Sequence, residues 1–192
     1  MTFIGELVEI PRGRAPQGVL GLERLLRPSA EGRGFSGRAV SLETLEELHA
    51  LMAVGPGMTG ASPTRVLFVT SPSAKARLAR RLAPRTRDAA VLAPACAVVG
   101  YDRQFAEQLI AFVGDGVGGE SCFDRPGTLK ATAMRNSVLQ GAYLALSARA
   151  LGLDAAFLHG FDGVAVAAEF FRDPGVSAIF VAALGYPLEP AG

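Results

Sequence analysis

The sequence predicts a single folded domain that combines helices with short apolar strands. The chain has 192 residues, of which 49% are hydrophobic and 19% charged, enough apolar surface for one sizeable core. The segment 129–151 is apolar or small almost all round, which is typical of one long buried helix. Three apolar runs, at 66–70, 95–101 and 177–184, are predicted to be strands. The run 95–101 is nearly all apolar, so we expect it to be buried on both faces.

The N-terminal part of the chain differs from the rest. Pro11, Gly13, Pro16 and Gly18 break any regular period in residues 1–20, which we interpret as an N-terminal extension or edge segment. Residues 21–192 contain no internal repeat and no linker, and are predicted to form the single domain. Its predicted shorter helices cover 22–26, 42–53, 73–83, 102–113 and 164–171.

Helix 42–53 has a clear start and an apolar face. Ser41 precedes it as an expected N-cap. One face is apolar at helical spacing, carried by Leu42, Leu45, Leu48, Leu51 and Met52.

The most informative stretch runs from Arg135 to Asp162. The long helix ends at Gly152, a residue that readily adopts the left-handed conformation found at helix ends. Residues 155–158 then give a brief strand, and 159–162 form a tight turn that contains His159. Asp162 is placed to cap helix 164–171 by accepting backbone N–H bonds.

Charge and cysteine content exclude several classes of function. Lys plus Arg is 19 and Asp plus Glu is 18, a net charge of +1, which gives no electrostatic reason to expect nucleic acid or an anionic membrane as a partner. No apolar run approaches the ~20 residues that span a bilayer. Cys96 lies in an apolar run, Cys122 lies in a glycine-rich segment, and neither has metal-ligand spacing to other residues. We expect a cytoplasmic protein with reduced thiols and no metal.

Three motifs together resemble the nitroreductase family of FMN enzymes, most closely its malonic semialdehyde reductase branch. They are the helix and turn at 135–162, Ala93-Pro94 before the strand that ends Gly100-Tyr101-Asp102, and the terminal 183–186, Ala-Leu-Gly-Tyr. The resemblance implies an α+β fold with a central, mostly antiparallel sheet flanked by helices. It also implies an intertwined homodimer, with the long helix at the interface and two FMN sites between the subunits.

The same resemblance assigns cofactor positions, several of which are altered here. Those that match the family's flavin contacts are Arg33, Pro56, Ser62, Asn136, Leu158 and Gly160. Arg33 would bind the FMN phosphate, because a guanidinium fork fits phosphate oxygens. The first arginine of that motif falls near Ala30, Gly60 replaces an asparagine, and no Lys or Arg follows Arg172. Other arginines could compensate for these polar contacts, or the flavin could have been lost.

His159 is the candidate catalytic residue. At the turn where the family keeps its active site, an imidazole could donate a hydrogen bond or a proton to a substrate carbonyl. The structural alternative is a histidine that only bonds a neighbouring backbone carbonyl.

Three functions follow from the resemblance. The first is an FMN-dependent oxidoreductase that moves hydride from NADH or NADPH to a small carbonyl, enal or nitro substrate. The second is a flavin-independent enzyme that acts on a small organic molecule in the vacated cavity. The third is a non-catalytic partner subunit. No dinucleotide fingerprint is present, so the choice between NADH and NADPH stays open.

Overall fold

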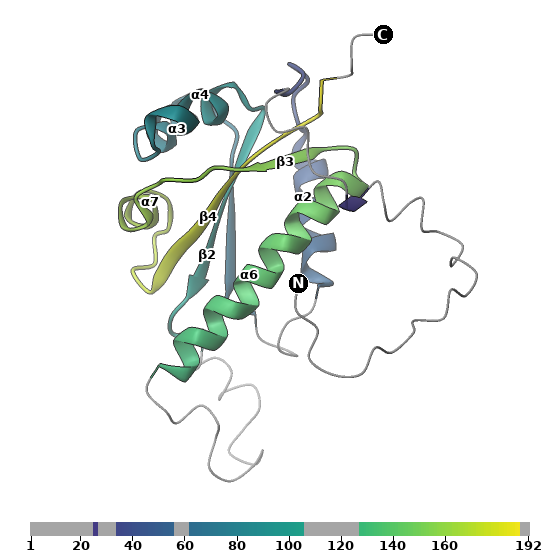
Figure 1. Ribbon diagram of the computed structural model, residues 1–192. Helices are drawn as coiled ribbons and strands as arrows, with labels where there is room; N and C mark the ends of the chain where they lie inside the picture. The colour runs from purple at the N-terminus through teal and green to yellow at the C-terminus, as the bar shows by residue number, and fades with distance from the viewer. Residues whose placement is uncertain (1–24, 27–33, 56–61, 106–126, 189–192) are drawn as a thin grey trace, which may run out of the picture.

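A four-stranded antiparallel sheet with strand order β1-β2-β4-β3 is the centre of the protein. The structure is a computed structural model that describes residues 25–26, 34–55, 62–105 and 127–188 (Figure 1). The strands are β1 (Thr64–Val69), β2 (Ala95–Asp102), β3 (Asp154–Phe157) and β4 (Val176–Gly185). Helices flank the sheet, which confirms the predicted α+β class.

Several predictions lie outside the described residues. They are the N-terminal segment 1–20, most of helices 22–26 and 102–113, and the glycine-rich segment that includes Cys122. Within the described ranges, no helix is both long and apolar enough to cross a bilayer.

Strand β2 divides the core into two apolar layers. All of its residues are buried, and successive side chains of a strand point to opposite faces. On one face, Ala95, Ala97 and Val99 pack with helices α2 (Leu42–Ala53) and α6 (Thr128–Ala150). On the other face, Cys96 and Val98 pack with α3 (Pro72–Ala79), α4 (Pro84–Leu92) and α7 (Gly163–Phe170). Burial on both faces is the arrangement predicted for this strand.

Helix α2 forms as predicted but buries a narrower face than its sequence pattern indicates. The Ser41 hydroxyl accepts a hydrogen bond from the Thr44 backbone N–H at 3.1 Å, which confirms the N-cap. Leu45, Leu48 and Met52 are buried, whereas Leu42 is 72% and Leu51 39% exposed. The helix rests on α6, so only the stripe that faces α6 and the sheet is covered.

The predicted long helix corresponds to α6, and its bounds agree within a residue. Gly152 after it has φ +75°, the predicted left-handed helix end. Its C-terminal half packs on the sheet, where Leu144, Ala145 and Ala148 are buried. Its N-terminal half leaves apolar side chains uncovered in the single chain: Met134, Val138 and Leu139 are 47%, 43% and 42% exposed.

The predicted helix over 73–83 forms as α3 but ends four residues early, and a second helix follows beyond the predicted range. Helix α3 ends at Ala79, and α4, which was not predicted, begins with Pro84. A proline lacks the N–H that would continue a helix but fits the first helical position of a new one. The Ala83 N–H between them donates instead to the Gly160 carbonyl at 2.6 Å.

Candidate functional site

The turn that carries His159 is bonded to β4 and to the segment that joins α3 to α4, where the Asp162 N–H donates to the Arg81 carbonyl at 3.0 Å. The Leu158 N–H donates to the Val181 carbonyl at 2.8 Å, which extends the β3–β4 ladder by one residue. Gly160 then takes φ +74°, a conformation that glycine adopts without steric cost. The Asp162 side chain accepts from the Ala165 N–H at 3.0 Å, so the predicted cap of α7 is confirmed.

The imidazole of His159 is exposed. The backbone carbonyl of this residue accepts from the Thr86 hydroxyl at 3.4 Å. Among the described residues, the ring itself makes no hydrogen bond or ion pair, so the expected structural alternative, a ring bonded to a neighbouring carbonyl, is not observed. The catalytic assignment of His159 stays a prediction.

The segments that carry Ser62 and Asn136 meet at the start of β1. The Thr64 and Ser137 hydroxyls are 2.9 Å apart, and these residues are close in sequence to Ser62 and Asn136. One turn further along α6, the Gln140 side-chain amide donates to the Gly55 carbonyl at 3.2 Å. Gly55 directly precedes Pro56, which lies outside the described residues.

Asn136 has a buried amide nitrogen that finds no hydrogen-bond partner among the described residues. Leaving a buried donor unsatisfied costs about 1–3 kcal/mol. A ligand with an acceptor atom at this place would remove that cost. Flavin carbonyl oxygens are such acceptors, so the residue present fits the cofactor that the resemblance implies.

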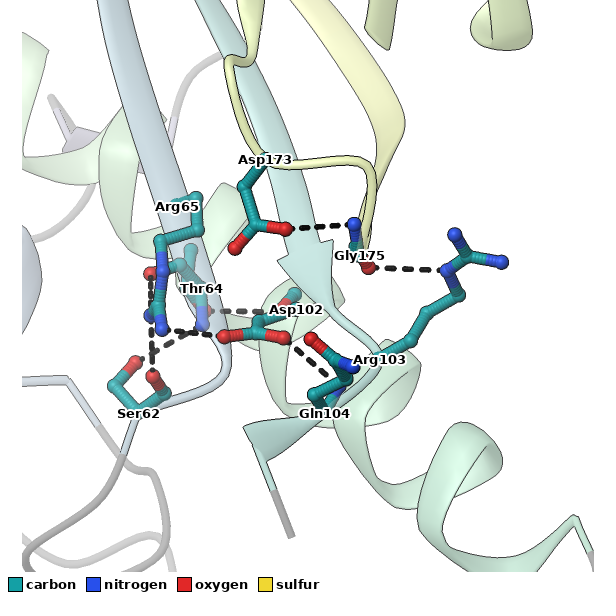
Figure 2. Close-up of polar contacts among 9 residues, drawn as sticks. Ser62, Thr64, Arg65, Asp102, Arg103, Gln104, Asp173 and Gly175 are labelled. Atoms are coloured by element: carbon teal, nitrogen blue, oxygen red, sulfur yellow. Dashed lines mark hydrogen bonds and ion pairs between the residues drawn. The ribbon is translucent and has the colours of Figure 1, made fainter. Parts of the chain in front are cut away.

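An ion pair that the sequence did not predict lies beside Ser62, and it joins a buried carboxylate to a guanidinium side chain that is 34% exposed (Figure 2). Asp102 is 2% exposed, and its carboxylate is 2.6 Å from the Arg65 guanidinium. Arg65 also donates to the carbonyls of Ser62 at 2.9 Å and Thr64 at 3.2 Å. The sequence feature that could have indicated this pair is Asp102 itself, an acidic residue at the end of an otherwise uncharged strand.

The end of β2 is tied to its neighbours on both sides. The Asp102 N–H donates to the Pro63 carbonyl at 2.7 Å, and its carboxylate accepts from the Gln104 N–H at 2.8 Å. The Arg103 side chain donates to the Gly175 carbonyl at 3.0 Å, beside the Asp173 carboxylate that accepts from the Gly175 N–H (Figure 2).

Those predicted site residues that the structure describes fall into two groups, which one chain does not bring together. Leu158 and Gly160 lie on the layer of α3 and α4, whereas Asn136 lies on α6 over the opposite face. The register places Leu158 level with Leu67 across the sheet. With strands about 4.8 Å apart and a rise of about 3.3 Å per residue, Leu158 and Thr64 are separated by roughly 17 Å.

Arg33 also lies outside the described residues. Phe35 and Ser36, which follow it closely in sequence, belong to the Leu158 group. Phe35 bridges to Pro187 and packs against the cluster that contains Leu158. The Ser36 N–H donates to the Tyr186 carbonyl at 2.8 Å. Phe35 and Ser36 are thus anchored beside the end of β4.

A cleft of about 660 Å³ opens between α7 and the beginning of β4. Its walls include Phe161, Val164 and Ala178, and Arg103 and Asp173 add charges of opposite sign. It adjoins Asp162, on the far side of the turn from Gly160.

Cys96 is a buried core residue, as predicted. Burial raises the pKa of its thiol from the ordinary 9.0 to about 12, against a smaller lowering by Lys75. The thiol is therefore neutral at physiological pH and does not act as a nucleophile. No group of three or more potential metal ligands occurs among the described side chains.

Comparison with known proteins gives one family. The model of the nitroreductase family matches residues 29–186. A Caulobacter sp. (strain K31) protein named "Putative NADH dehydrogenase/NAD(P)H nitroreductase" is 37% identical over 168 residues, which cover 88% of this chain and 86% of that protein.

Solved structures agree with that family in fold. A nitroreductase family protein from Streptococcus pneumoniae superposes with a TM-score of 0.72 at 17% identity, covering 91% of this chain and 94% of the other. A protein described as a "putative nitroreductase in complex with FMN", from Exiguobacterium sibiricum, gives a TM-score of 0.68 at 21% identity, with 83% and 86% covered. At these identities the likeness shows the fold.

Proposed function

The chain belongs to the nitroreductase family, and on this premise we propose that it is an FMN-dependent oxidoreductase. It takes hydride from NADH or NADPH and reduces a small carbonyl, enal or nitro compound. The name of the Caulobacter relative supports the nicotinamide cofactor, and the Exiguobacterium complex supports FMN. The observation that carries the proposal is the buried amide nitrogen of Asn136, which finds no hydrogen-bond partner among the described residues.

The residues that would hold FMN come from both groups. Asn136 would donate its amide hydrogen to the cofactor, and the Ser62 hydroxyl lies in the same neighbourhood. The backbone of Leu158 and Gly160 would face the ring, since a glycine permits close approach. Arg33 would bind the phosphate, and Pro56 would pack against the ring. FMN, when bound, supplies the hydride chemistry, while the protein supplies orientation and a dry site.

A homodimer would bring the two groups to one site. Asn136 and Leu158 lie on opposite faces of the sheet, so a second copy is needed for one ligand to touch both groups. The exposed apolar side chains of α6, Met134, Val138 and Leu139, supply a surface of the kind that obligate interfaces cover. These observations support the dimer that the family resemblance implies.

His159 has the exposure and the chemistry of a proton donor. Reduction of a carbonyl leaves negative charge on its oxygen, and a protonated imidazole can neutralise that charge by giving up its proton. Because no described residue engages the ring, it can reorient toward a bound substrate. We assign His159 this role.

The visible spectrum of the purified protein tests the proposed function. Bound oxidised flavin gives an absorption band near ~450 nm, since the cofactor that performs the hydride chemistry is itself coloured. A protein that is colourless and takes up no added FMN would contradict the proposal and favour the flavin-independent enzyme. Replacing Asn136 by Leu should reduce FMN uptake without lowering the stability of the FMN-free protein, because a buried unsatisfied donor is removed.

A further inference from the structure

We propose that Asp102 and Arg65 are positioning residues for the cofactor site: their ion pair fixes the Ser62–Pro63 segment so that the Ser62 hydroxyl meets the ligand bound by Asn136. The inference rests on the proposed function. Neither residue needs to touch the cofactor. Both act through the backbone that carries Ser62.

Each carbonyl of this segment is held by one member of the pair. Arg65 donates to the Ser62 and Thr64 carbonyls, and the Asp102 backbone N–H donates to the Pro63 carbonyl that lies between them. Ser62 and Pro63 precede the β1–β2 ladder, which begins at the Thr64–Tyr101 pair. The ladder itself therefore leaves them unfixed, and these three bonds set their direction (Figure 2).

The same segment is connected to Asn136. The Thr64 N–H donates to the Ser62 hydroxyl at 3.3 Å, and the Thr64 hydroxyl contacts that of Ser137, next to Asn136. A shift of Ser62 relative to Thr64 would thus change the position of the Ser62 hydroxyl relative to the Asn136 amide. The ion pair and Asn136 are linked by consecutive contacts.

The energetics favour a geometric role over a purely stabilising one. The Asp102 side chain is 3% exposed and the Arg65 side chain 34%, and the cost of desolvating the buried carboxylate offsets much of the attraction between them. Apolar residues of similar volume often stabilise a protein as well as such a pair does. What an apolar pair lacks is the set of guanidinium donors that fixes the Ser62 and Thr64 carbonyls.

The direction in which FMN affinity changes on removing the Asp102 charge distinguishes a positioning role from a direct electrostatic one. The FMN phosphate is anionic, so removing the Asp102 carboxylate should by charge alone strengthen FMN binding. If Asp102→Asn weakens binding instead, the cause is geometry. Asp154→Asn is the matched control: Asp154 is a largely buried partner of Arg149, 3.7 Å away, on β3 and without contact to Ser62.

FMN affinity, measured by the quenching of FMN fluorescence on binding, is the test. We expect Asp102→Asn to raise the dissociation constant about tenfold, as for a hydrogen bond to a charged or polar ligand group that is no longer aligned. Arg65→Lys keeps the positive charge, and with it the fold, but cannot reach both carbonyls, so it should also weaken binding. Asp154→Asn should leave affinity unchanged even where its melting temperature falls.

A double-mutant cycle with Ser62→Ala tests the route. If Asp102 acts through Ser62, the double variant binds FMN no more weakly than Asp102→Asn alone, because contacting sites are not additive. Additive losses overturn the inference. The inference is also overturned if Asp102→Asn and Arg65→Lys bind FMN as tightly as the wild-type protein does. A wild-type protein that binds no FMN overturns the proposed function, and this inference with it.

Discussion

At the scale of single residues, His159 offers the sharpest test of the mechanism. Its exposed ring contributes little to packing, so His159→Ala should lower the melting temperature only slightly. If the imidazole donates the proton, the turnover number falls by ~10²-fold or more, the usual scale for general acid catalysis. Steady-state kinetics on the FMN-loaded variant checks this. Unchanged turnover would leave only the backbone of Leu158 and Gly160 as the functional part of the turn.

Cys96 should make stability depend on alkaline pH. Its pKa is raised by burial to about 12 in the folded protein from an ordinary 9.0. Above pH 9 the unfolded chain loses the thiol proton and the folded protein keeps it. The stability present below pH 9 is therefore lost as pH rises toward 12, by ~1.4 kcal/mol per pH unit.

Cys96→Ser serves as the reference for this effect, because its hydroxyl does not ionise in that range. Urea unfolding between pH 9 and 11 should give a steeper fall for the wild type than for the variant. Equal slopes would show that the thiol ionises in the folded protein as readily as in the unfolded chain.

Single residues were also the hardest scale to predict from sequence. Ser41, Gly152 and Asp162 were identified correctly because capping depends on residues within a few positions of each other. The Arg65–Asp102 pair joins residues 37 positions apart, and no local pattern indicates that β1 and β2 bring them together. Likewise, the sequence does not indicate that the Asn136 amide nitrogen is buried without a partner among the described residues. That observation requires the three-dimensional structure.

At the scale of the elements, the pairing of β2 with β4 has a bulge, where the register shifts between Val99 and Gly100, and this bulge depends on the absence of a side chain at Gly100. A Cβ at Gly100 would lie 2.8 Å from the Ser177 carbonyl oxygen and 2.8 Å from a Val176 methyl group. Because a backbone atom cannot move aside easily, we expect Gly100→Ala to reduce the free energy of unfolding by ~1–3 kcal/mol.

Thermal unfolding of Gly100→Ala, with Gly37→Ala as its control, checks this expectation. Nothing lies within 4 Å of a Cβ built at Gly37, so the control should match the wild type. A Gly100→Ala protein of wild-type stability would mean that the β2–β4 register can slide at the bulge.

The spacing of apolar residues along the sequence predicted most helices and strands correctly. It failed at the end of α3, where the amino-acid composition favours a continued helix. Helices α2 and α6 and all four strands agree with their predicted positions within two residues or so. The segment 73–83 is rich in alanine and arginine, both good helix formers, which hid the helix end at Ala79. Pro84 is a signal for the start of α4. Because the helix 73–83 was predicted to end just before it, Pro84 was not recognised as the start of a new helix.

At the scale of the whole molecule, the exposed apolar stripe on α6 predicts the assembly. We expect a dimer by light scattering at micromolar concentration. Val138→Glu should shift it toward monomer and reduce FMN binding together, because a buried charge without a partner is costly at an interface and both groups of the site are needed.

Val164→Glu on α7 is the matched control, since Val164 is 83% exposed over the opposite face of the sheet. It should leave mass and FMN affinity unchanged. A monomeric wild type that still binds FMN would show that one chain completes the site alone.

The strand order has a consequence for how the protein is made. β2 pairs on one side with β1 and on the other with β4, in contacts such as Cys96–Ala183. Once β1 and β2 have left the ribosome, the edge of β2 that later pairs with β4 is therefore open, and such an edge can recruit other chains. That edge stays open until residues 176–185 emerge. We expect the nascent chain to be most prone to aggregation during this interval.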